Sequence, residues 1–451
     1  MAEENAKAGS GDWLITKQVP AAWIDGYADR PSVQAGDPLQ LFTDTAAATW
    51  TARVFRLGWY GGAKGRLIWT SPAQPGVRQE APMVDAATGL AEARWKQSLV
   101  ITTRDDWPPG TYVIRLDTPG GGSHLVPFTI RDDDSTADVM VLNAVTTWQA
   151  YNAWGGCSLY SCPGNKTRKR ATLVSFDRPY AHQFGDGSAD LFDHELSLIA
   201  LVESEGLDVT YATDIDLHEH PQLATNHRVI VSLGHDEYYS TPMRRALEAA
   251  RDGGVNLMFL GANAVYRHIR LEPSWDGRVS RRVANYRSVV DPGATTNPKL
   301  ATVEWRVAPL GEPEARLIGI QYACAGVDAP LRVAQAGHWI WAGTGVRDGQ
   351  LLPSLVGNEA DRMVPSSPPN LDLLARSPIV CGKQAAEHAM SYYSHPSGAG
   401  IFATGTIWWV CAIDAMCSVP QNAPIVRRVT LNVLQAFAAG PAGVVHPSGR
   451  S

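Results

Sequence analysis

The sequence predicts a chain in two parts, a β-sandwich of immunoglobulin-like type followed by a doubly wound α/β domain. Its 451 residues exceed what one hydrophobic core usually serves, so two domains are expected. Short strand-like segments and Gly/Pro turns dominate the beginning of the chain, whereas strand and helix patterns alternate afterwards. The polar run 131–136 separates the two patterns. We therefore expect a sandwich over 13–132 and an α/β domain over 137–440.

The expected strands of the N-terminal part are short, and most are rich in β-branched or aromatic residues. They cover 39–43, 51–57, 97–102 and 112–117. Gly/Pro turns punctuate them at 60–62, 108–110 and 119–122. Many short strands at this spacing are typical of an immunoglobulin-like sandwich. The sequence shows no metal cluster or nucleophile here, so we expect this part to pack or to form one wall of a site.

The second part alternates buried strands with amphipathic helices, as in flavodoxin-like or glutamine-amidotransferase-like folds. One helix is marked by Ser240 as N-cap, Pro242 in its first turn and Gly253 at its end. A β-rich elaboration at about 266–383, with strand-like pieces such as 302–308, interrupts the alternation. The other segments are the strands 139–145, 208–213, 228–233, 255–260 and 400–404, a helix at 191–206, the apolar piece 407–412 and a closing helix near 426–438.

Composition excludes several classes of function. The chain has 45% hydrophobic and 19% charged residues and a net charge of −6, as an ordinary globular protein does. The densest basic run, 166–170, is short and lies beside a Pro-Gly turn, so no nucleic-acid partner is expected. No apolar stretch is long enough to cross a bilayer, and no signal peptide is visible. A cytoplasmic location without membrane partners is favoured, with secretion through a removed leader left open.

The six cysteines are too few for a disulfide scaffold in a chain of this length. Cys157 lies near Cys162 and Cys411 near Cys417, but neither pair has the spacing of a zinc ribbon. Buried free thiols are the favoured interpretation, and local disulfides are the alternative.

Polar side chains follow four of the expected strands of the α/β part, where ligands bind in open parallel sheets. The third strand is followed by a His-Asp-Glu sequence before a helix, at a turn where amidotransferase-like hydrolases carry a Cys or Ser. A covalent acyl-enzyme route from this turn is therefore disfavoured. In chain order the four groups are Tyr151; Asp214 and Asp216; His235 and Glu237; and Asn263.

Each of these residues alone also has a plain structural interpretation. Glu237 is typical of a helix cap, and Asn263 of a turn after a strand. His235 alone is typical of a hydrogen-bonded structural histidine, and tyrosines at sheet ends usually pack. Their convergence on one predicted edge favours a functional site.

Four segments in order resemble the signature segments of the N,N-dimethylformamidase large-subunit family. They are WQAYNAWGG (148–156), FDRPY (176–180), GHDEY (234–238) and FLGAN (259–263), and LGWYGG (57–62) is similar to that family's β-domain. The resemblance spans most of the chain. It implies an iron-dependent hydrolase that cleaves the C–N bond of a small amide, with one Fe(III) held by two tyrosinates and a glutamate.

Carried over by motif, Tyr151 and Tyr180 are the phenolate ligands and Glu237 is the carboxylate ligand. His235 and Asn263 are then neighbours of the open coordination position. Further tyrosines compete for the phenolate roles, namely Tyr160, Tyr238 and Tyr239.

The implied ligands suit the implied chemistry. Phenolate and carboxylate oxygens are hard donors that favour Fe(III) over Zn(II). Such a metal polarises an amide carbonyl or lowers the pKa of bound water. His235 could accept a proton from the attacking water and later protonate the departing amine, while Asn263 could hydrogen-bond the carbonyl oxygen.

The chain departs from the family pattern in length. The characterised type is a larger polypeptide with an additional domain and a small partner subunit. The 451 residues here leave little room for that domain, and no partner subunit is evident, although a homo-oligomer stays open. The substrate is therefore expected to be a small amide that need not be dimethylformamide.

Three alternative functions are kept. A phenolate–iron centre can also support oxidative chemistry. A non-enzymatic protein could bind a small molecule or carbohydrate through some of the 15 tryptophans. A cysteine hydrolase would use Cys157 or Cys162.

Overall fold

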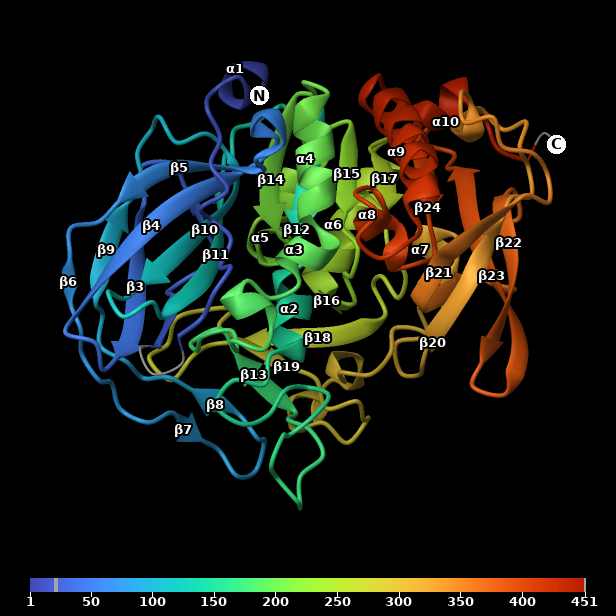
Figure 1. The fold of residues 1–451 in the computed structure, drawn as a ribbon. Coiled ribbons are helices and arrows are strands. Elements are labelled where there is room, and N and C mark those ends of the chain that lie inside the picture. Colours follow the sequence, from blue (N-terminus) through green and yellow to red (C-terminus); the bar gives the residue numbers. More distant parts are fainter. Residues whose placement is uncertain (20–22, 450–451) are drawn as a thin grey trace.

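The computed structural model describes residues 1–19 and 23–449. It has a mixed architecture that is built mostly from sheets, with several helices between and beside them (Figure 1). Strands of the N-terminal part lie on one side of the molecule, helices occupy the centre, and the C-terminal strands and helices lie on the other side.

Two larger sheets form most of the N-terminal part, in the orders β1-β3-β9 and β2-β11-β10-β4-β5, with β6 on β4. All neighbours are antiparallel except β2 and β11. Side chains of both sheets share one core, around Trp50, Tyr112 and Phe128. The strands are β1 (Ile24–Ala28), β2 (Ser32–Gln34), β3 (Pro38–Thr45), β4 (Thr49–Leu57), β5 (Gly65–Thr70), β6 (Gln74–Pro75), β9 (Leu99–Thr102), β10 (Gly110–Asp117) and β11 (Ser123–Arg131). The four strands expected from the sequence are confirmed.

A seven-stranded sheet organises the rest, in the order β14-β12-β15-β17-β24-β23-β22. The first five strands are parallel and almost wholly buried, which accounts for their apolar sequences. Two antiparallel strands extend the sheet at one edge. The strands are β12 (Val139–Asn143), β14 (Val209–Thr213), β15 (Val229–Ser232), β17 (Asn256–Phe259), β22 (Asp372–Cys381), β23 (Gln384–Ser394) and β24 (Gly400–Ala403).

Most helices are short, and α6 begins and ends at the expected signals. Ser240 caps α6 by accepting a hydrogen bond from the Met243 amide, and Gly253 ends it, as predicted. The helix expected at 191–206 is instead broken at Glu195, whose buried carboxylate accepts hydrogen bonds from Asn143 and Trp148. The apolar piece 407–412 is helical. The helices are α1 (Ala2–Asn5), α2 (Val145–Tyr151), α3 (Leu191–His194), α4 (Leu196–Ser204), α5 (Asp214–Glu219), α6 (Thr241–Asp252), α7 (Ala315–Ile318), α8 (Trp408–Ala412), α9 (Ala423–Ala438) and α10 (Ala442–Val445).

The region after α6 is rich in strands, but 302–308 is not one of them. There the backbone forms turns, with the Val307 amide donating to the Glu304 carbonyl at 3.0 Å, and only one isolated bridge joins Glu304 to Arg267. A four-stranded sheet has the order β13-β19-β18-β16, and β20 pairs with β21. These strands, with the small pair β7 and β8, are β7 (Met83–Val84), β8 (Ala91–Glu92), β13 (Leu173–Ser175), β16 (Tyr238–Ser240), β18 (Arg267–Glu272), β19 (Arg282–Ala284), β20 (Gln321–Arg332) and β21 (Leu351–Arg362).

All six cysteines form disulfides, so the expectation of buried free thiols is wrong. Cys157–Cys162 and Cys411–Cys417 are the local pairs kept as the alternative. Cys324–Cys381 joins β20 to β22 across a separation of 57 residues, which adjacency in sequence could not reveal. The expected cytoplasmic location rested partly on free thiols and loses that support. The cysteine hydrolase alternative loses its nucleophile, because Cys157 and Cys162 are bonded to each other.

Within the described ranges, no helix has the length and hydropathy needed to span a bilayer.

Candidate active site

The polar groups predicted at the strand ends do meet at one edge of the seven-stranded sheet. Strands β12, β15 and β17 are parallel neighbours, so their carboxyl ends lie together. Tyr151 ends the helix that follows β12, Glu237 follows β15, and Asn263 follows β17. Asp214 and Asp216, at the end of β14, serve instead as local hydrogen-bond acceptors for Thr146 and Thr213.

Glu237 is the centre of the cluster, and its side chain is 1% exposed. Its Oε2 accepts hydrogen bonds from the hydroxyls of Tyr151, at 3.1 Å, and of Tyr160. The two phenol rings stack with centroids 4.1 Å apart. The Glu237 amide donates to Thr147 Oγ1 at 2.9 Å, which fixes the turn. This turn leads through the short strand β16 to the helix α6, whose N-cap is Ser240, as predicted.

Arginines surround this acidic cluster. Arg267 Nε lies 3.4 Å from Glu237 Oε1, and Arg287 lies over the Tyr160 ring at 4.4 Å from its centroid. Arg287 also donates a hydrogen bond to the Tyr238 hydroxyl at 3.0 Å. Burial first, and then the Glu237 charge, raise the pKa of both Tyr151 and Tyr160. Without a further positive charge both phenols therefore keep their protons.

His235 bridges two carboxylates. Its Nδ1 lies 3.4 Å from Asp190 Oδ2, and its Nε2 lies 3.8 Å from Glu237 Oε2 and has no hydrogen-bond partner. Burial lowers the pKa of His235, but the hydrogen bond and charge of Asp190 outweigh it and raise the value to about 9. His194 stands edge-on to His235 with ring centroids 5.9 Å apart. His235 is thus held in one orientation by a carboxylate behind it.

Asn263 occupies a tight turn beside this histidine. Its φ is 62°, in the left-handed region that asparagine tolerates, and its amide donates to Asp361 Oδ1 at 2.8 Å. Its side-chain Oδ1 is buried without a hydrogen-bond partner, while its side chain interacts with the Glu359 carboxylate. Burial raises the pKa of Glu359 to about 7.

The glycine at position 261 lets two turns of the site touch. A Cβ added to Gly261 would overlap the carbonyl oxygen of Gly234, so the turn that carries Asn263 lies directly on the turn that carries His235. Glycine is required at this close approach.

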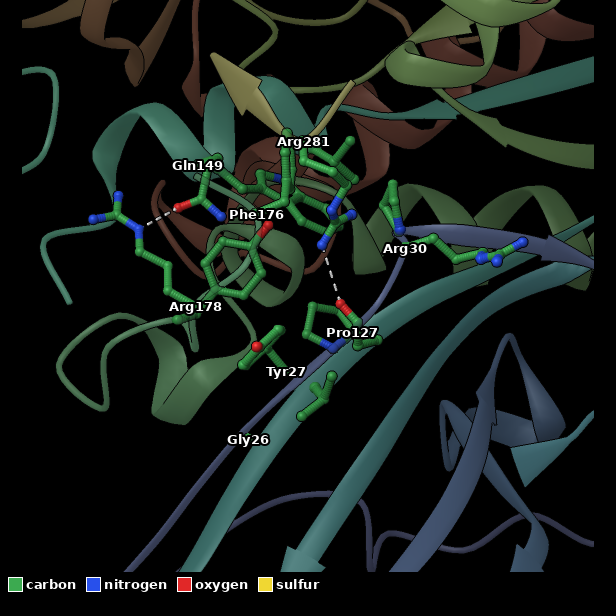
Figure 2. Close-up of a pocket in the computed structure, with 14 residues that line it drawn as sticks. Gly26, Tyr27, Arg30, Pro127, Gln149, Phe176, Arg178 and Arg281 are labelled. Atoms are coloured by element: carbon green, nitrogen blue, oxygen red, sulfur yellow. Dashed lines mark hydrogen bonds between the residues drawn. The ribbon is translucent and has the colours of Figure 1, made fainter. Parts of the chain in front are cut away.

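Tyr180 lies apart from Glu237. Its ring packs edge-on against Trp148 and Phe184, each with centroids 6.4 Å away. It lines a cavity of about 30 Å³ beside Arg178, whose Nε donates to Gln149 Oε1 at 3.1 Å (Figure 2). In the part of the chain that the structure describes, no hydrogen bond or ring contact joins Tyr180 to Glu237. The tyrosine that joins Tyr151 at Glu237 is therefore Tyr160, one of the named competitors, and not Tyr180.

The donor set fits a hard cation. Three oxygens, from Tyr151, Tyr160 and Glu237, converge in a buried place where desolvation, and then the Glu237 charge, keep both phenols protonated. A trivalent cation among them would supply positive charge and favour the phenolates. The unpartnered His235 Nε2 and Asn263 Oδ1 lie at the same edge. The arrangement can therefore hold a hard metal ion with an imidazole and a side-chain amide beside it.

Several residues of the site escaped the sequence analysis. Asp190 and Glu359 come from a loop and from β21, at positions with no motif of their own. Arg267 and Arg287 follow in the region treated as an elaboration. Tyr160 was named only as a competitor for the phenolate roles. Its nearness to Tyr151 in the sequence was the one signal that could have indicated its place in the site.

Comparison with known proteins identifies the family of the chain. A family model described as "N,N-dimethylformamidase beta subunit-like, C-terminal" matches residues 51–422. A protein of Paracoccus aminophilus named N,N-dimethylformamidase beta subunit is 23% identical, over 77% of this chain and 55% of that protein. One of the same name from Alcaligenes sp. is 25% identical, over 57% of this chain and 38% of that protein. The chain thus spans about half or less of the length of these relatives.

Among solved structures, an uncharacterized protein from Bacillus anthracis aligns with 28% of this chain at 11% identity and a TM-score of 0.17. This likeness is too small to bear on fold or function.

Proposed function

The chain belongs to the N,N-dimethylformamidase beta subunit-like family, and from this membership we propose that it is a hydrolase of the C–N bond in a small amide. The observation that carries the proposal is the meeting of two tyrosine hydroxyls on the buried Glu237 carboxylate, next to a carboxylate-oriented histidine. The names of the two bacterial relatives support the same class of reaction.

The proposal includes one Fe(III), held by Tyr151, Tyr160 and Glu237. Tyr160 replaces Tyr180 in this set because its hydroxyl reaches Glu237. When bound, such an ion supplies Lewis acidity toward an amide carbonyl or a water molecule. Arg267 and Arg287 then hold the carboxylate and a phenol ring in position.

His235 is the proposed proton carrier. It takes a proton from the attacking water at Nε2 and returns it to the departing amine. Its raised pKa means that it is protonated at neutral pH in the metal-free protein, whereas a base needs the neutral form. A cation on the adjacent Glu237 opposes that proton by charge repulsion and lowers the pKa of His235.

Asn263 is the proposed donor to the substrate oxygen. Its side-chain NH2 group, which also interacts with the Glu359 carboxylate, lies in the turn that contacts the His235 turn. Hydrogen bonding to the oxygen strengthens as negative charge develops there, which favours the transition state over the ground state.

The experiment that tests this function combines iron analysis with turnover. Purified protein is assayed for amine release from a panel of small amides, dimethylformamide included, next to Glu237→Gln and the exposed-site control Glu219→Gln. We expect iron and amine release in the wild type and in Glu219→Gln, and neither in Glu237→Gln. An iron-free wild type that releases amine from none of these amides, even after iron is added, would contradict the proposal.

The proposal extends to architecture. The two N-terminal sheets share one core, as an immunoglobulin-like sandwich over 13–132 would, and the five parallel strands suit a doubly wound domain over 137–440. Limited proteolysis tests it, because cleavage within the largely exposed 132–136 should yield two compact fragments.

A further inference from the structure

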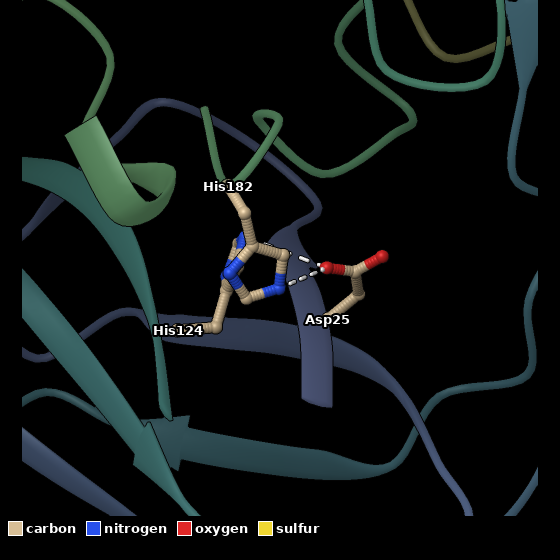
Figure 3. Close-up of side chains that lie close together, drawn as sticks. All are labelled: Asp25, His124 and His182. Atoms are coloured by element: carbon tan, nitrogen blue, oxygen red, sulfur yellow. Dashed lines mark ion pairs between the residues drawn. The ribbon is translucent and has the colours of Figure 1, made fainter. Parts of the chain in front are cut away.

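A second cluster of metal-ligating side chains lies away from Glu237, where the N-terminal sheets meet the loop after Tyr180. Asp25 comes from β1, His124 from β11, and His182 from that loop (Figure 3). His182 Nε2 lies 3.0 Å and His124 Nε2 lies 3.7 Å from Asp25 Oδ1. The three ligand atoms all fall within 4.8 Å of one another.

We propose that Asp25, His124 and His182 bind a divalent transition-metal cation of the zinc class, separate from the iron site. Two imidazoles and one carboxylate are a common donor set for Zn²⁺ and similar ions. Ligand atoms about 2.0–2.1 Å from a tetrahedral zinc ion are separated from each other by roughly 3.3 Å. The two distances to Asp25 Oδ1 lie on either side of that value.

Unsatisfied polar atoms point to a ligand at this place. Asp25 Oδ1 and His182 Nε2 are buried and make no correctly oriented hydrogen bond, although they are adjacent. The other carboxylate oxygen of Asp25 accepts a hydrogen bond from Trp154 Nε1 at 2.8 Å, which turns Oδ1 toward the imidazoles. Such outer contacts are the usual way in which a protein orients a metal ligand.

The two histidines differ in charge state. Burial lowers the pKa of His182, but its contact with Asp25 outweighs this and raises the pKa, so a cation must displace a proton there. Complete burial lowers the pKa of His124 to about 4, so its ring is neutral at neutral pH and keeps a free lone pair. His124 Nε2 lies 2.9 Å from the Tyr180 carbonyl oxygen, so a cation must compete with that hydrogen bond and shift the ring proton to Nδ1. His124 Nδ1 is buried without a hydrogen-bond partner, so only the Tyr180 carbonyl favours the ring proton on Nε2.

The site joins distant segments, and only one of its side chains is partly exposed. The His182 side chain is 29% exposed, while those of Asp25 and His124 are buried. A bound cation would fasten the loop that carries Arg178 and Tyr180 to β1 and β11. The sequence predicted no metal cluster in the N-terminal part, because its third ligand lies beyond the expected boundary.

Zinc titration of three proteins tests the site. The wild type, His182→Asn and the control His395→Asn are dialysed against Zn²⁺ without removing iron, and both metals are then measured per chain. We expect the wild type and the control to bind about one more Zn²⁺ per chain than His182→Asn, with equal iron in all three. Co²⁺ in place of Zn²⁺ should give a visible spectrum that His182→Asn lacks.

A second variant keeps the test decisive if the loop changes on mutation. Asp25→Asn preserves side-chain volume and should lose the same Zn²⁺ equivalent while circular dichroism stays that of the wild type. Equal Zn²⁺ in the wild type and both variants, or no Zn²⁺ bound by the wild type, would overturn the proposal. Zinc stoichiometry does not depend on amide hydrolysis, so the two proposals can fail separately.

Discussion

His235 depends on a residue that the sequence did not suggest, Asp190. The carboxylate lies 3.4 Å from His235 Nδ1, which leaves Nε2 facing Glu237. Removing such an outer partner typically costs about 10–100-fold in activity or metal affinity. Asp190→Asn should therefore lower kcat by about that factor while iron content and KM stay close to those of the wild type. The exposed Asp193→Asn is the matched control, and an unchanged kcat in Asp190→Asn would refute the positioning role.

Sequence reasoning found those site residues that follow strands and missed those that do not. His235, Glu237 and Asn263 each come directly after a parallel strand, so the rule about strand ends was sufficient to group them. Tyr160 and Asp190 lie in irregular loops, whose paths depend on tertiary contacts. The motif alone favoured Tyr180, whereas the structure fixes the backbone on both sides of Tyr180, at Pro179 and Ala181, by hydrogen bonds to Asn152.

At the scale of elements, a buried ion pair fastens β4 to α4. Arg56 and Glu203 are both fully buried, and two hydrogen bonds of 2.6 and 2.9 Å join them. The Glu203 carboxylate also accepts from Tyr211 on β14. Glu203→Gln would leave the Arg56 charge uncompensated, and breaking such a pair costs about 3–5 kcal/mol.

Urea unfolding of Glu203→Gln should therefore show a loss of that order, about 3–5 kcal/mol, in the free energy of unfolding. Glu205→Gln, two residues away and exposed, is expected to unfold as the wild type does. Equal stability of the two variants would mean that the ion pair does not hold these elements together.

Element boundaries were predictable where a local signal sets them. Ser240 and Gly253 set the two ends of α6, and both residue types are recognisable in the sequence as helix-end signals. The break at Glu195 was not predictable, because its cause is a hydrogen-bond network with Asn143 and Trp148, residues distant in the chain.

For the whole molecule, the disulfide Cys324–Cys381 is the longest covalent link, since it closes a loop of 57 residues. Restricting a loop of this length in the unfolded chain is worth about 4 kcal/mol in the chain-entropy view. Cys324→Ser with Cys381→Ser should lower the melting temperature more than Cys411→Ser with Cys417→Ser, whose loop spans 6 residues. The reverse order in differential scanning calorimetry would contradict this account.

The coarse composition of the molecule, β-rich first and α/β afterwards, followed from hydrophobic periodicity, because burial on one or both faces of a strand leaves a direct pattern in sequence. The disulfide Cys324–Cys381 and the Asp25–His124–His182 cluster left no such pattern in the sequence. Their members lie on segments far apart in the chain, and only the packed structure brings them together.

The most direct measurement of the central claim is the visible spectrum and iron content of Tyr160→Phe beside Tyr180→Phe. A site made by Tyr151, Tyr160 and Glu237 predicts a phenolate-to-Fe(III) absorption band in the wild type and in Tyr180→Phe. The band should shift or vanish in Tyr160→Phe, with less iron retained. A band that survives in Tyr160→Phe and disappears in Tyr180→Phe would contradict the assignment and return the second ligand to Tyr180.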